Sequence, residues 1–407
     1  MEQGSRNKGL IVISYSNLLV PLTATDVIYY HKVEALLKLG WTRTLILQGD
    51  KQSSSGSSKD YIIHLNSKVV TLNDGINGRF FRHFLFLLMC FVKVINIRKE
   101  YGIIYFVGAE FLPIALFAKT VLGYTVVGDV DTYTIAYNRG EIDSSGAYDL
   151  VERLFEPFMN SCDVVVVINE RDRDALVRRG FNPEKILIMP PSRTIPEFDE
   201  TYRKKLRADF IAQLQDKGFP YSGDVIIITF HGSGKSLHNR KTIDNIVYKV
   251  VPEVLRYDKR FLFLIIGGGY VLDKQTQQKY GKHIYITGFL EEQRMQELLL
   301  ISDIYIAPMT FRAKGGTKTK VIEAAAYGLP VIIPPELGEQ YFKKGCPFII
   351  SNIDGFPNVI RTLALNEETR SKIGHETYDY VKEYYSDRNY DLFAKEIIRI
   401  VNGSKFR

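Results

Sequence analysis

Two successive series of short β-rich runs, separated by helix-like stretches, restrict the fold of this 407-residue chain more than any other feature. Runs such as residues 164–168, Val-Val-Val-Val-Ile, are apolar throughout, which is typical of strands buried on both faces of a parallel sheet. Two such series of similar size predict an α/β protein with two doubly wound, Rossmann-like domains facing each other across a cleft. A chain of this length can supply each domain with its own core.

The predicted elements divide into a first and a second half. In the first half, strands are expected at residues 10–14, 44–48, 61–65, 103–107, 124–127, 163–168 and 185–189, and helices at 27–39, 80–98, 112–122, 148–160 and 171–179. In the second half, strands are expected at residues 225–230, 261–266, 284–287, 304–307, 331–333 and 348–350, and helices at 240–257, 292–300, 317–327, 367–385 and 391–401.

The alternation is interrupted between residues 192 and 223, where Pro196, Pro220 and a basic run occur. We therefore predict an N-terminal domain at residues 1–195, an interdomain segment at 196–223 and a C-terminal domain at 224–385. The remaining residues, 386–407, are predicted to form a helix that packs back on the first domain.

Charge and composition restrict the partners. The net charge of +7 favours acidic partners, such as nucleotide phosphates, lipid phosphates or an anionic membrane surface. Nucleic acid is not expected, because the chain lacks zinc-finger spacing, an RNP-like motif and a concentrated basic stripe. The three cysteines are scattered and the seven histidines lack zinc-ligand spacing, so neither disulfides nor a metal site are predicted. Because the polar start shows no signal peptide, we expect a cytoplasmic protein.

One helix-like stretch, from Phe80 to Val92, could contact a membrane. No segment reaches the roughly 18 apolar residues of a membrane span. The uninterrupted apolar part of this stretch begins only at Phe84 and is flanked by Arg82 and Lys93. The stretch could be a core-facing helix of the first domain. Alternatively, it could be an interfacial helix that docks the protein peripherally on the inner face of the membrane.

A glycine-led helix start follows the apolar run at residues 304–308. The segment from Gly315 to Glu323 begins with two glycines and continues with helical composition. Such a turn directs backbone N–H groups and the positive end of the helix dipole beyond the carboxyl end of the strand, where phosphates bind. Lys320 and Glu323, at i and i+3, share one helical face. They could serve a diphosphate and a pair of ribose hydroxyls, or form an ordinary surface ion pair.

Further motifs surround this helix in a definite order. His231-Gly232-Ser233 follows a predicted strand, Asn239 begins a helix, and three glycines end the strand at residues 261–266. Thr287-Gly288-Phe289 and Ala307-Pro308 come next. This series resembles the C-terminal domain of GT-B glycosyltransferases of the group 1, family-four type. The resemblance covers residues 224–351 well and the first half mainly by architecture.

The resemblance implies a transferase that moves a sugar from a nucleotide-diphosphate-sugar donor to a glycan, lipid-linked or other acceptor. It implies retention of anomeric configuration and no metal or other cofactor. The first domain would bind the acceptor and the second the donor. Asp131 and Lys320 would be catalytic, with Asp131 facing the transferred sugar. The expected donor contacts, from diphosphate through base to ribose, are Gly232, Ser233, Lys235, Gly288, Phe289, Gly316, Thr317, Lys320 and Glu323.

Several alternatives remain open at this stage. Many retaining members carry an acidic residue where Gly315 stands, so a non-catalytic binding protein of the same fold is one alternative, and a 2-epimerase is another. A P-loop NTPase is disfavoured because Thr229 occupies the position of the first glycine of that motif. Asp129 and Asp131 imitate the metal-binding pair of GT-A enzymes. The second βα series argues against that fold, so both aspartates are expected to line the cleft, although Asp129 could equally belong to a plain strand-end turn.

Overall fold

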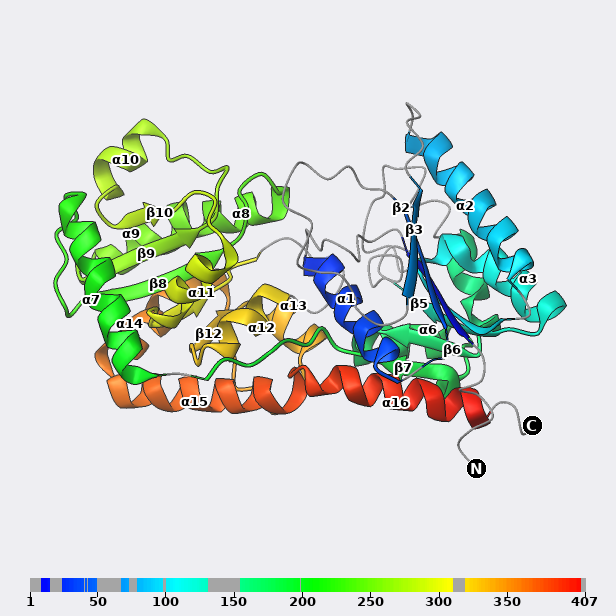
Figure 1. The fold of residues 1–407 in the computed structure, drawn as a ribbon. Helices are drawn as coiled ribbons and strands as arrows, with labels where there is room; N and C mark the ends of the chain where they lie inside the picture. Colours follow the sequence, from blue (N-terminus) through cyan, green and yellow to red (C-terminus); the bar gives the residue numbers. More distant parts are fainter. Residues whose placement is uncertain are drawn as a thin grey trace. The chain divides into compact units, whose positions relative to one another are not determined.

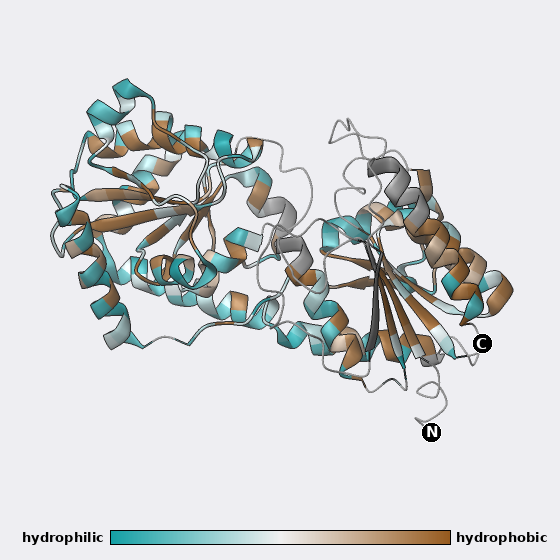
Figure 2. Ribbon diagram, turned by 45° about the horizontal axis from the view of Figure 1, so that its top comes forward, coloured by the Kyte–Doolittle hydropathy of each residue, from teal (hydrophilic) through white to brown (hydrophobic). Residues whose placement is uncertain are grey.

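The computed structural model describes residues 9–14, 24–39, 41, 43–49, 67–72, 79–97, 100–130, 154–197, 199–309 and 319–403. These residues form two compact units (Figure 1). The described residues up to Ser192 and those from Asp387 onward belong to the first unit, and those from Arg193 to Ser386 belong to the second. In each unit the strands consist mainly of hydrophobic residues, which form its core (Figure 2).

The first unit contains a seven-stranded sheet with the order β3-β2-β1-β4-β5-β6-β7. All of its strand pairs are parallel. The strands are β1 (Gly9–Ser14), β2 (Thr44–Gly49), β3 (Ser67–Leu72), β4 (Tyr101–Val107), β5 (Thr125–Asp129), β6 (Val164–Val167) and β7 (Ile186–Ile188). The helices are α1 (Ala24–Leu37), α2 (Arg79–Asn96), η1 (Ala109–Phe111), α3 (Leu112–Leu122), η2 (Glu156–Ser161), α6 (Glu170–Arg178), η3 (Pro183–Lys185) and α16 (Arg388–Gly403).

Two separate hydrophobic clusters hold the helices of the first unit on its sheet. One joins α2, α3 and α6 to the strands, and the other joins α1 and α16 to them. The last helix, α16, buries Tyr390, Phe393 and Ile397, whose spacing forms one face of a helix. It lies beside α1, and the hydroxyl of Tyr390 donates a hydrogen bond of 2.7 Å to the carbonyl of Ser192. The C-terminal segment is therefore part of the core of the first unit.

The second unit contains a six-stranded parallel sheet with the order β10-β9-β8-β11-β12-β13. Its strands are β8 (Ile226–His231), β9 (Phe261–Ile266), β10 (Ile284–Ile286), β11 (Ile304–Ile306), β12 (Val331–Ile333) and β13 (Ile349–Ile350). Its helices are α7 (Glu200–Asp216), α8 (Leu237–Asn245), η4 (Ile246–Val250), α9 (Val251–Leu255), α10 (Lys274–Tyr280), α11 (Glu292–Leu300), α12 (Thr319–Ala326), α13 (Pro335–Tyr341), η5 (Ile353–Gly355), α14 (Phe356–Leu365) and α15 (Glu367–Tyr384).

The prediction of two doubly wound parallel units is confirmed, and every strand predicted in the second half corresponds to a strand of its sheet. In the first half, the strand predicted at residues 61–65 lies outside the described residues, and β3 begins at Ser67. The sequence pattern did not predict α7, which occupies most of the expected interdomain segment. This helix buries Phe210, Ile211 and Leu214 in the core of the second unit.

The helix predicted at residues 240–257 is interrupted. It consists of α8, a π-helical turn at η4 and α9. Pro252 stands at the start of α9. Because proline has no backbone N–H group, it cannot donate the hydrogen bond that would continue the preceding helix without interruption. No helix in the described residues combines the length and the apolar character needed to cross a bilayer.

Candidate functional site

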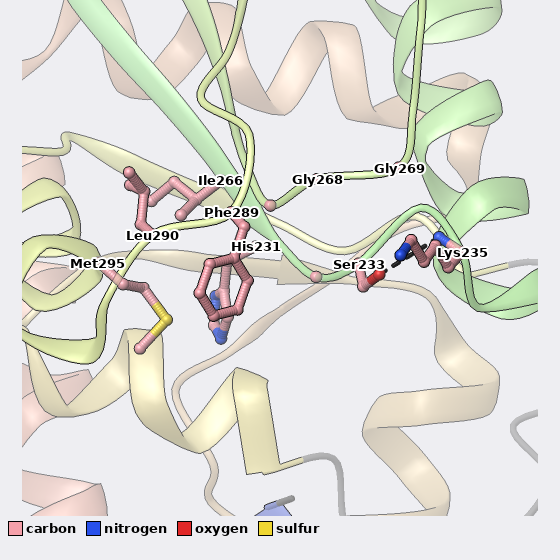
Figure 3. Close-up of a pocket in the computed structure, with 11 residues that line it drawn as sticks. His231, Ser233, Lys235, Ile266, Gly268, Gly269, Phe289, Leu290 and Met295 are labelled. Atoms are coloured by element: carbon pink, nitrogen blue, oxygen red, sulfur yellow. Dashed lines mark hydrogen bonds between the residues drawn. The ribbon is translucent and has the colours of Figure 1, made fainter. Parts of the chain in front are cut away.

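A pocket of about 500 Å³ lies in the second unit, where β8 and β9 end. The order of the parallel sheet reverses on either side of β8, and ligands of doubly wound folds bind at the carboxyl ends of strands beside such a reversal. Figure 3 shows an apolar side with Phe289, Leu290 and Met295 and a polar side with Ser233 and Lys235. The lining residues are His231, Gly232, Ser233, Lys235, Ile266, Gly267, Gly268, Gly269, Phe289, Leu290 and Met295.

Glycines bring the loops after β8 and β9 into direct contact. The amide of Gly232 donates to the carbonyl of Ile266 at 2.8 Å, and the amide of Gly234 donates to that of Gly268 at 2.8 Å. Gly267 has φ 138°, and a Cβ atom on it would lie 2.5 Å from the carbonyl oxygen of Gly232. A larger residue at position 267 would collide with this carbonyl oxygen. The glycines after β9 therefore allow the two loops to meet and line the pocket.

The loop after β10 forms the third side of the pocket. Thr287 fixes it, because its hydroxyl accepts from the amide of Gly267 at 3.2 Å and donates to the carbonyl of Gly288 at 2.8 Å. Gly288 has φ 78°, and Phe289 follows with 90% of its surface exposed. A large aromatic ring that the protein core does not use can provide a stacking surface for a planar ligand.

Lys320 reaches the pocket loop from the first turn of α12. Its Nζ donates to Oδ1 of Asn239 at 2.5 Å and lies 5.1 Å from the centre of the Phe230 ring. The same Nζ lies 2.8 Å from the point that a Cβ atom on Gly232 would occupy. The structure therefore places this cation against the glycine turn that lines the pocket.

Glu323 lies one turn further along α12 and holds two partners. Its Oε2 is 3.1 Å from Nε2 of His231, and its Oε1 is 2.6 Å from a terminal nitrogen of Arg193. Burial alone would raise the pKa of Glu323, but the hydrogen bond with His231 and the charge of Arg193 outweigh it and hold that pKa at about 2. Glu323 is therefore ionised at neutral pH.

His231 connects Glu323 to the pocket at the end of β8. Burial lowers the pKa of its ring, and the nearby charges of Lys320 and Arg193 act in the same direction, while Glu323 opposes them. The ring is therefore neutral at pH 7, with its proton on Nε2, where the carboxylate accepts it. Its Nδ1 is buried without a hydrogen-bond partner among the described residues.

Lys235 and Ser233 lie on the polar side of the pocket. The amide of Lys235 donates to Oγ of Ser233 at 3.3 Å (Figure 3). Within the described part of the chain, the Lys235 ammonium group takes part in no ion pair. Two lysines from different elements thus supply positive charge on or beside the loop after β8.

Of the other predicted site residues, Asp131, Gly316 and Thr317 lie outside the described residues. Asp129 does not line a cleft. It is fully buried in the first unit, where its Oδ2 accepts from Nζ of Lys32 at 2.7 Å and from the hydroxyl of Tyr105 at 2.5 Å. The expectation that Asp129 lines the cleft was wrong because Lys32 is fully buried as well, and a buried ammonium group needs a counter-charge.

Neither Arg193 nor the ring of His231 was among the residues predicted to act in the site. Arg193 stands in the irregular segment after β7, far along the chain from Glu323, and no motif marks it. His231 belongs to the recognised His-Gly-Ser motif, but only its glycine and serine were expected to act. The described residues contain no group of three or more His, Cys, Asp or Glu side chains that could hold a metal ion.

Comparison with known proteins agrees with this geometry. Residues 226–368 match the model of the family "Glycosyl transferases group 1". The match lies within the second unit and confirms the resemblance inferred from the sequence for that part of the chain. Among curated proteins, no match to the sequence was found.

Several solved structures of similar fold cover nearly the whole chain. Sucrose-phosphate synthase from Thermosynechococcus elongatus is 14% identical, with a TM-score of 0.70 over 98% of this chain and 100% of that one. HepE from Anabaena, solved with UDP and glucose, is 14% identical, with a TM-score of 0.66 over 96% and 99%. The lipopolysaccharide outer core galactosyltransferase WaaB is 12% identical, with a TM-score of 0.61 over 97% and 99%. At these identities the likeness concerns the fold, which is that of GT-B glycosyltransferases.

Proposed function

We propose that this protein transfers a sugar from a nucleotide-diphosphate-sugar donor to a glycan, lipid-linked or other acceptor. The proposal includes retention of anomeric configuration and no requirement for a metal ion or other cofactor. The observation that carries it is the position of α12, which brings Lys320 against the Gly232 turn and Glu323 against His231 at one pocket. The group 1 family match covers the same residues.

The pocket has a distinct environment for each part of such a donor. The diphosphate would lie on the polar side, against the loop of Gly232 and Ser233, with Lys235 and Lys320 as cations. The base would lie against Gly288 and Phe289, and Glu323 would accept hydrogen bonds from the ribose hydroxyls. The backbone of Gly316 and Thr317 would add donors to the phosphates. HepE was solved with UDP-glucose, so a UDP-sugar is the first donor class to test.

The proposed catalysis depends on where negative charge develops during the transfer of the sugar. When the bond between the sugar and the diphosphate breaks, negative charge grows on the diphosphate oxygens. Lys320 and Lys235 stabilise that charge because they are held close to the pocket before the reaction begins. This electrostatic contribution replaces the divalent ion of GT-A enzymes. Asp131 would face the transferred sugar from the first unit.

A thermal-shift screen against UDP-, GDP- and ADP-sugars tests the donor class, since a ligand that binds only the folded state raises the Tm. Turnover with acceptor glycans then separates an enzyme from a non-catalytic binding protein. Product analysis without acceptor separates a transferase from a 2-epimerase, which needs none. Failure of every nucleotide sugar to raise the Tm would contradict the proposal.

The proposed partners include an anionic membrane surface on the cytoplasmic side, which would hold a lipid-linked acceptor near the enzyme. The inner face of α2 buries Phe86, Cys90 and Val94 in the first unit. The outer face is also apolar and is exposed at Leu88 and Val92. Hydrophobic residues cover much of this helix in Figure 2. Both alternatives for this stretch thus have support, because one face is core and the other faces outward.

The neighbouring helix extends this apolar surface. Phe91 of α2 and Phe117 of α3 pack with ring centres 4.8 Å apart, and Val121 of α3 is exposed. Residues 79–99 include five Lys or Arg residues and no Asp or Glu, a composition that favours anionic lipid. Flotation with vesicles of anionic and of zwitterionic lipid tests this contact. Leu88→Glu with Val92→Glu should abolish flotation, and Leu365→Glu, an exposed apolar position in the second unit, should not.

A further inference from the structure

Arg193 contacts Glu323, the carboxylate bound to the pocket residue His231, from a segment that carries no recognised motif. It is the first residue of the second unit. Its amide donates to the carbonyl of Tyr385 at 2.9 Å, and it forms an isolated parallel bridge with Ser386. Its backbone is thus fixed to the last residues of the same unit, and its side chain extends to α12.

The contacts of Glu323 leave room for a ligand. Arg193 engages Oε1 at 2.6 Å, and His231 engages Oε2 at 3.1 Å. A carboxylate has about four lone-pair sites, so each oxygen can accept one further hydrogen bond. The side chains of Arg193 and Glu323 are only 23% and 14% exposed, so solvent screens this ion pair less than a surface pair. Two donors, one on each oxygen, fix the rotation of the carboxylate.

We propose that Arg193 is a positioning residue of the donor site, which holds the Glu323 carboxylate in the orientation that accepts hydrogen bonds from the ribose hydroxyls. This inference rests on the proposed function, in which Glu323 contacts the ribose. Arg193 touches no reacting atom and acts through Glu323 alone.

The ion pair between Arg193 and Glu323 also affects the protonation of His231. The charged and titratable groups that face its ring are Glu323 and Lys320 of α12, Arg193, and Tyr305 of β11, whose ring centre lies 5.5 Å away. With Arg193 present, the charge of Glu323 is balanced and the imidazole is neutral. Without Arg193, the unbalanced carboxylate favours the imidazolium form. A protonated His231 then replaces Arg193 as the cation beside Glu323 at acidic pH.

The test compares the binding of UDP, GDP and ADP to four variants and the wild type by calorimetry between about pH 5.5 and 8.5, the range in which histidine titrates. Arg193→Gln removes the charge, Arg193→Lys keeps it, and Glu323→Gln removes the proposed ribose contact. Arg207→Gln is the matched control. Its ion pair with Asp303, at 2.9 Å with side chains 21% and 11% exposed, is as buried as that of Arg193, but the partners of Arg207 include no residue that lines the pocket.

We expect Arg193→Gln to weaken binding about tenfold at alkaline pH, and the difference from wild type to shrink toward acidic pH as His231 becomes protonated. Arg193→Lys should bind nearly as well as wild type. Arg207→Gln should bind like wild type at every pH, even if its Tm falls. The nucleotide itself can also titrate in this pH range. Its titration affects variant and wild type equally, so it cancels in the ratio of the two affinities.

The outcomes separate the inference from the proposed function. If Glu323→Gln binds the nucleotides as wild type does, or if wild type binds none of the three, the proposed ribose contact is wrong and the inference fails with it. If Glu323→Gln weakens binding while Arg193→Gln behaves like Arg207→Gln at every pH, only the role of Arg193 is wrong. If Arg193→Gln fails to fold, Arg193→Lys still tests the inference, because it retains the charge. A tenfold loss of nucleotide affinity in Arg193→Lys, without a change in Tm, would contradict the inference.

Discussion

Nζ of Lys320 lies 2.8 Å from the point that a Cβ atom on Gly232 would occupy. A lysine on α12 and a glycine after β8 thus share one small space, and the ammonium group is adjacent to a backbone turn that lines the pocket. The space exists only because residue 232 has no side chain. Two separate motifs therefore depend on each other, and this dependence can be tested.

We expect Gly232→Ala to displace the Lys320 ammonium group and to weaken nucleotide binding about tenfold or more. Gly218→Ala is the control, because Gly218 has φ 80° and no atom within 4 Å of the added Cβ. The control should lose about 1 kcal/mol of stability through backbone strain and keep its affinity. Calorimetric titration and chemical denaturation measure the two effects. Equal affinity of Gly232→Ala and wild type would contradict the shared-space argument.

Lys320→Ala should lower kcat about a hundredfold, since it removes a preorganised cation from the developing charge on the diphosphate. Lys343→Ala is a suitable control, because Lys343 also lies over an aromatic ring, that of Tyr384 at 5.0 Å, but it follows α13 and is not the lysine placed against the Gly232 turn. Steady-state kinetics with the donor identified by the thermal-shift screen measures both variants. Near-normal turnover by Lys320→Ala would disprove the assigned role.

Phe289→Ala should weaken nucleotide binding by about 1 kcal/mol or more through loss of base stacking. The folded protein should keep its stability, because 90% of the Phe289 surface is exposed and little packing is lost. Binding isotherms together with the Tm of the free protein separate the two properties. An unchanged Kd would show that the ring does not contact the base.

Glu323 should make stability depend on pH in the acidic range. Its pKa falls from an ordinary value of 4.5 to about 2 on folding, so its contribution is present above pH 4.5 and is lost as the pH falls toward 2. Glu323→Gln should therefore lower the free energy of unfolding at pH 7 by on the order of 2–3 kcal/mol, and the difference should shrink over that window. Urea denaturation at several pH values measures it. A difference that stays constant from neutral to acidic pH would exclude this linkage.

The buried pair of Lys32 and Asp129 should stabilise the first unit only as a pair. Either Lys32→Met or Asp129→Asn leaves a buried group without its partner and should cost about 3–5 kcal/mol. The double variant should be less destabilised than the sum of the two single changes. Denaturation monitored by probes in the first unit tests this, and strict additivity would mean that the two groups act independently.

The sequence predicted the strands well because their signal is local. Continuous apolar runs, such as the one that became β6, have few alternatives to a buried parallel strand. The helix with Lys320 and Glu323 could also be predicted, because glycine, charge and helical spacing occur within a few residues. The helix α7 was missed, since its three core residues are hidden among charged neighbours and two prolines frame the segment.

What could not be predicted depends on contacts between distant segments. Nothing near Arg193 indicates that its side chain reaches Glu323, because the two meet only after the second sheet has formed. Asp129 was misjudged for the same reason. Its partner Lys32 lies on α1, and a strand-end aspartate looks alike in sequence whether it faces a ligand or a buried lysine.

The packing of α16 also bears on synthesis by the ribosome. The chain leaves the first unit at Ser192 and returns to it at Asp387, and Phe393 then packs edge-on against Tyr105 at 6.4 Å. While the polypeptide is still emerging from the ribosome, the hydrophobic face of the first unit that α16 covers stays exposed. The second unit, in contrast, can already complete its own sheet. Nascent chains arrested before residue 388 should therefore be cleaved by protease in their N-terminal half, although that half is made first.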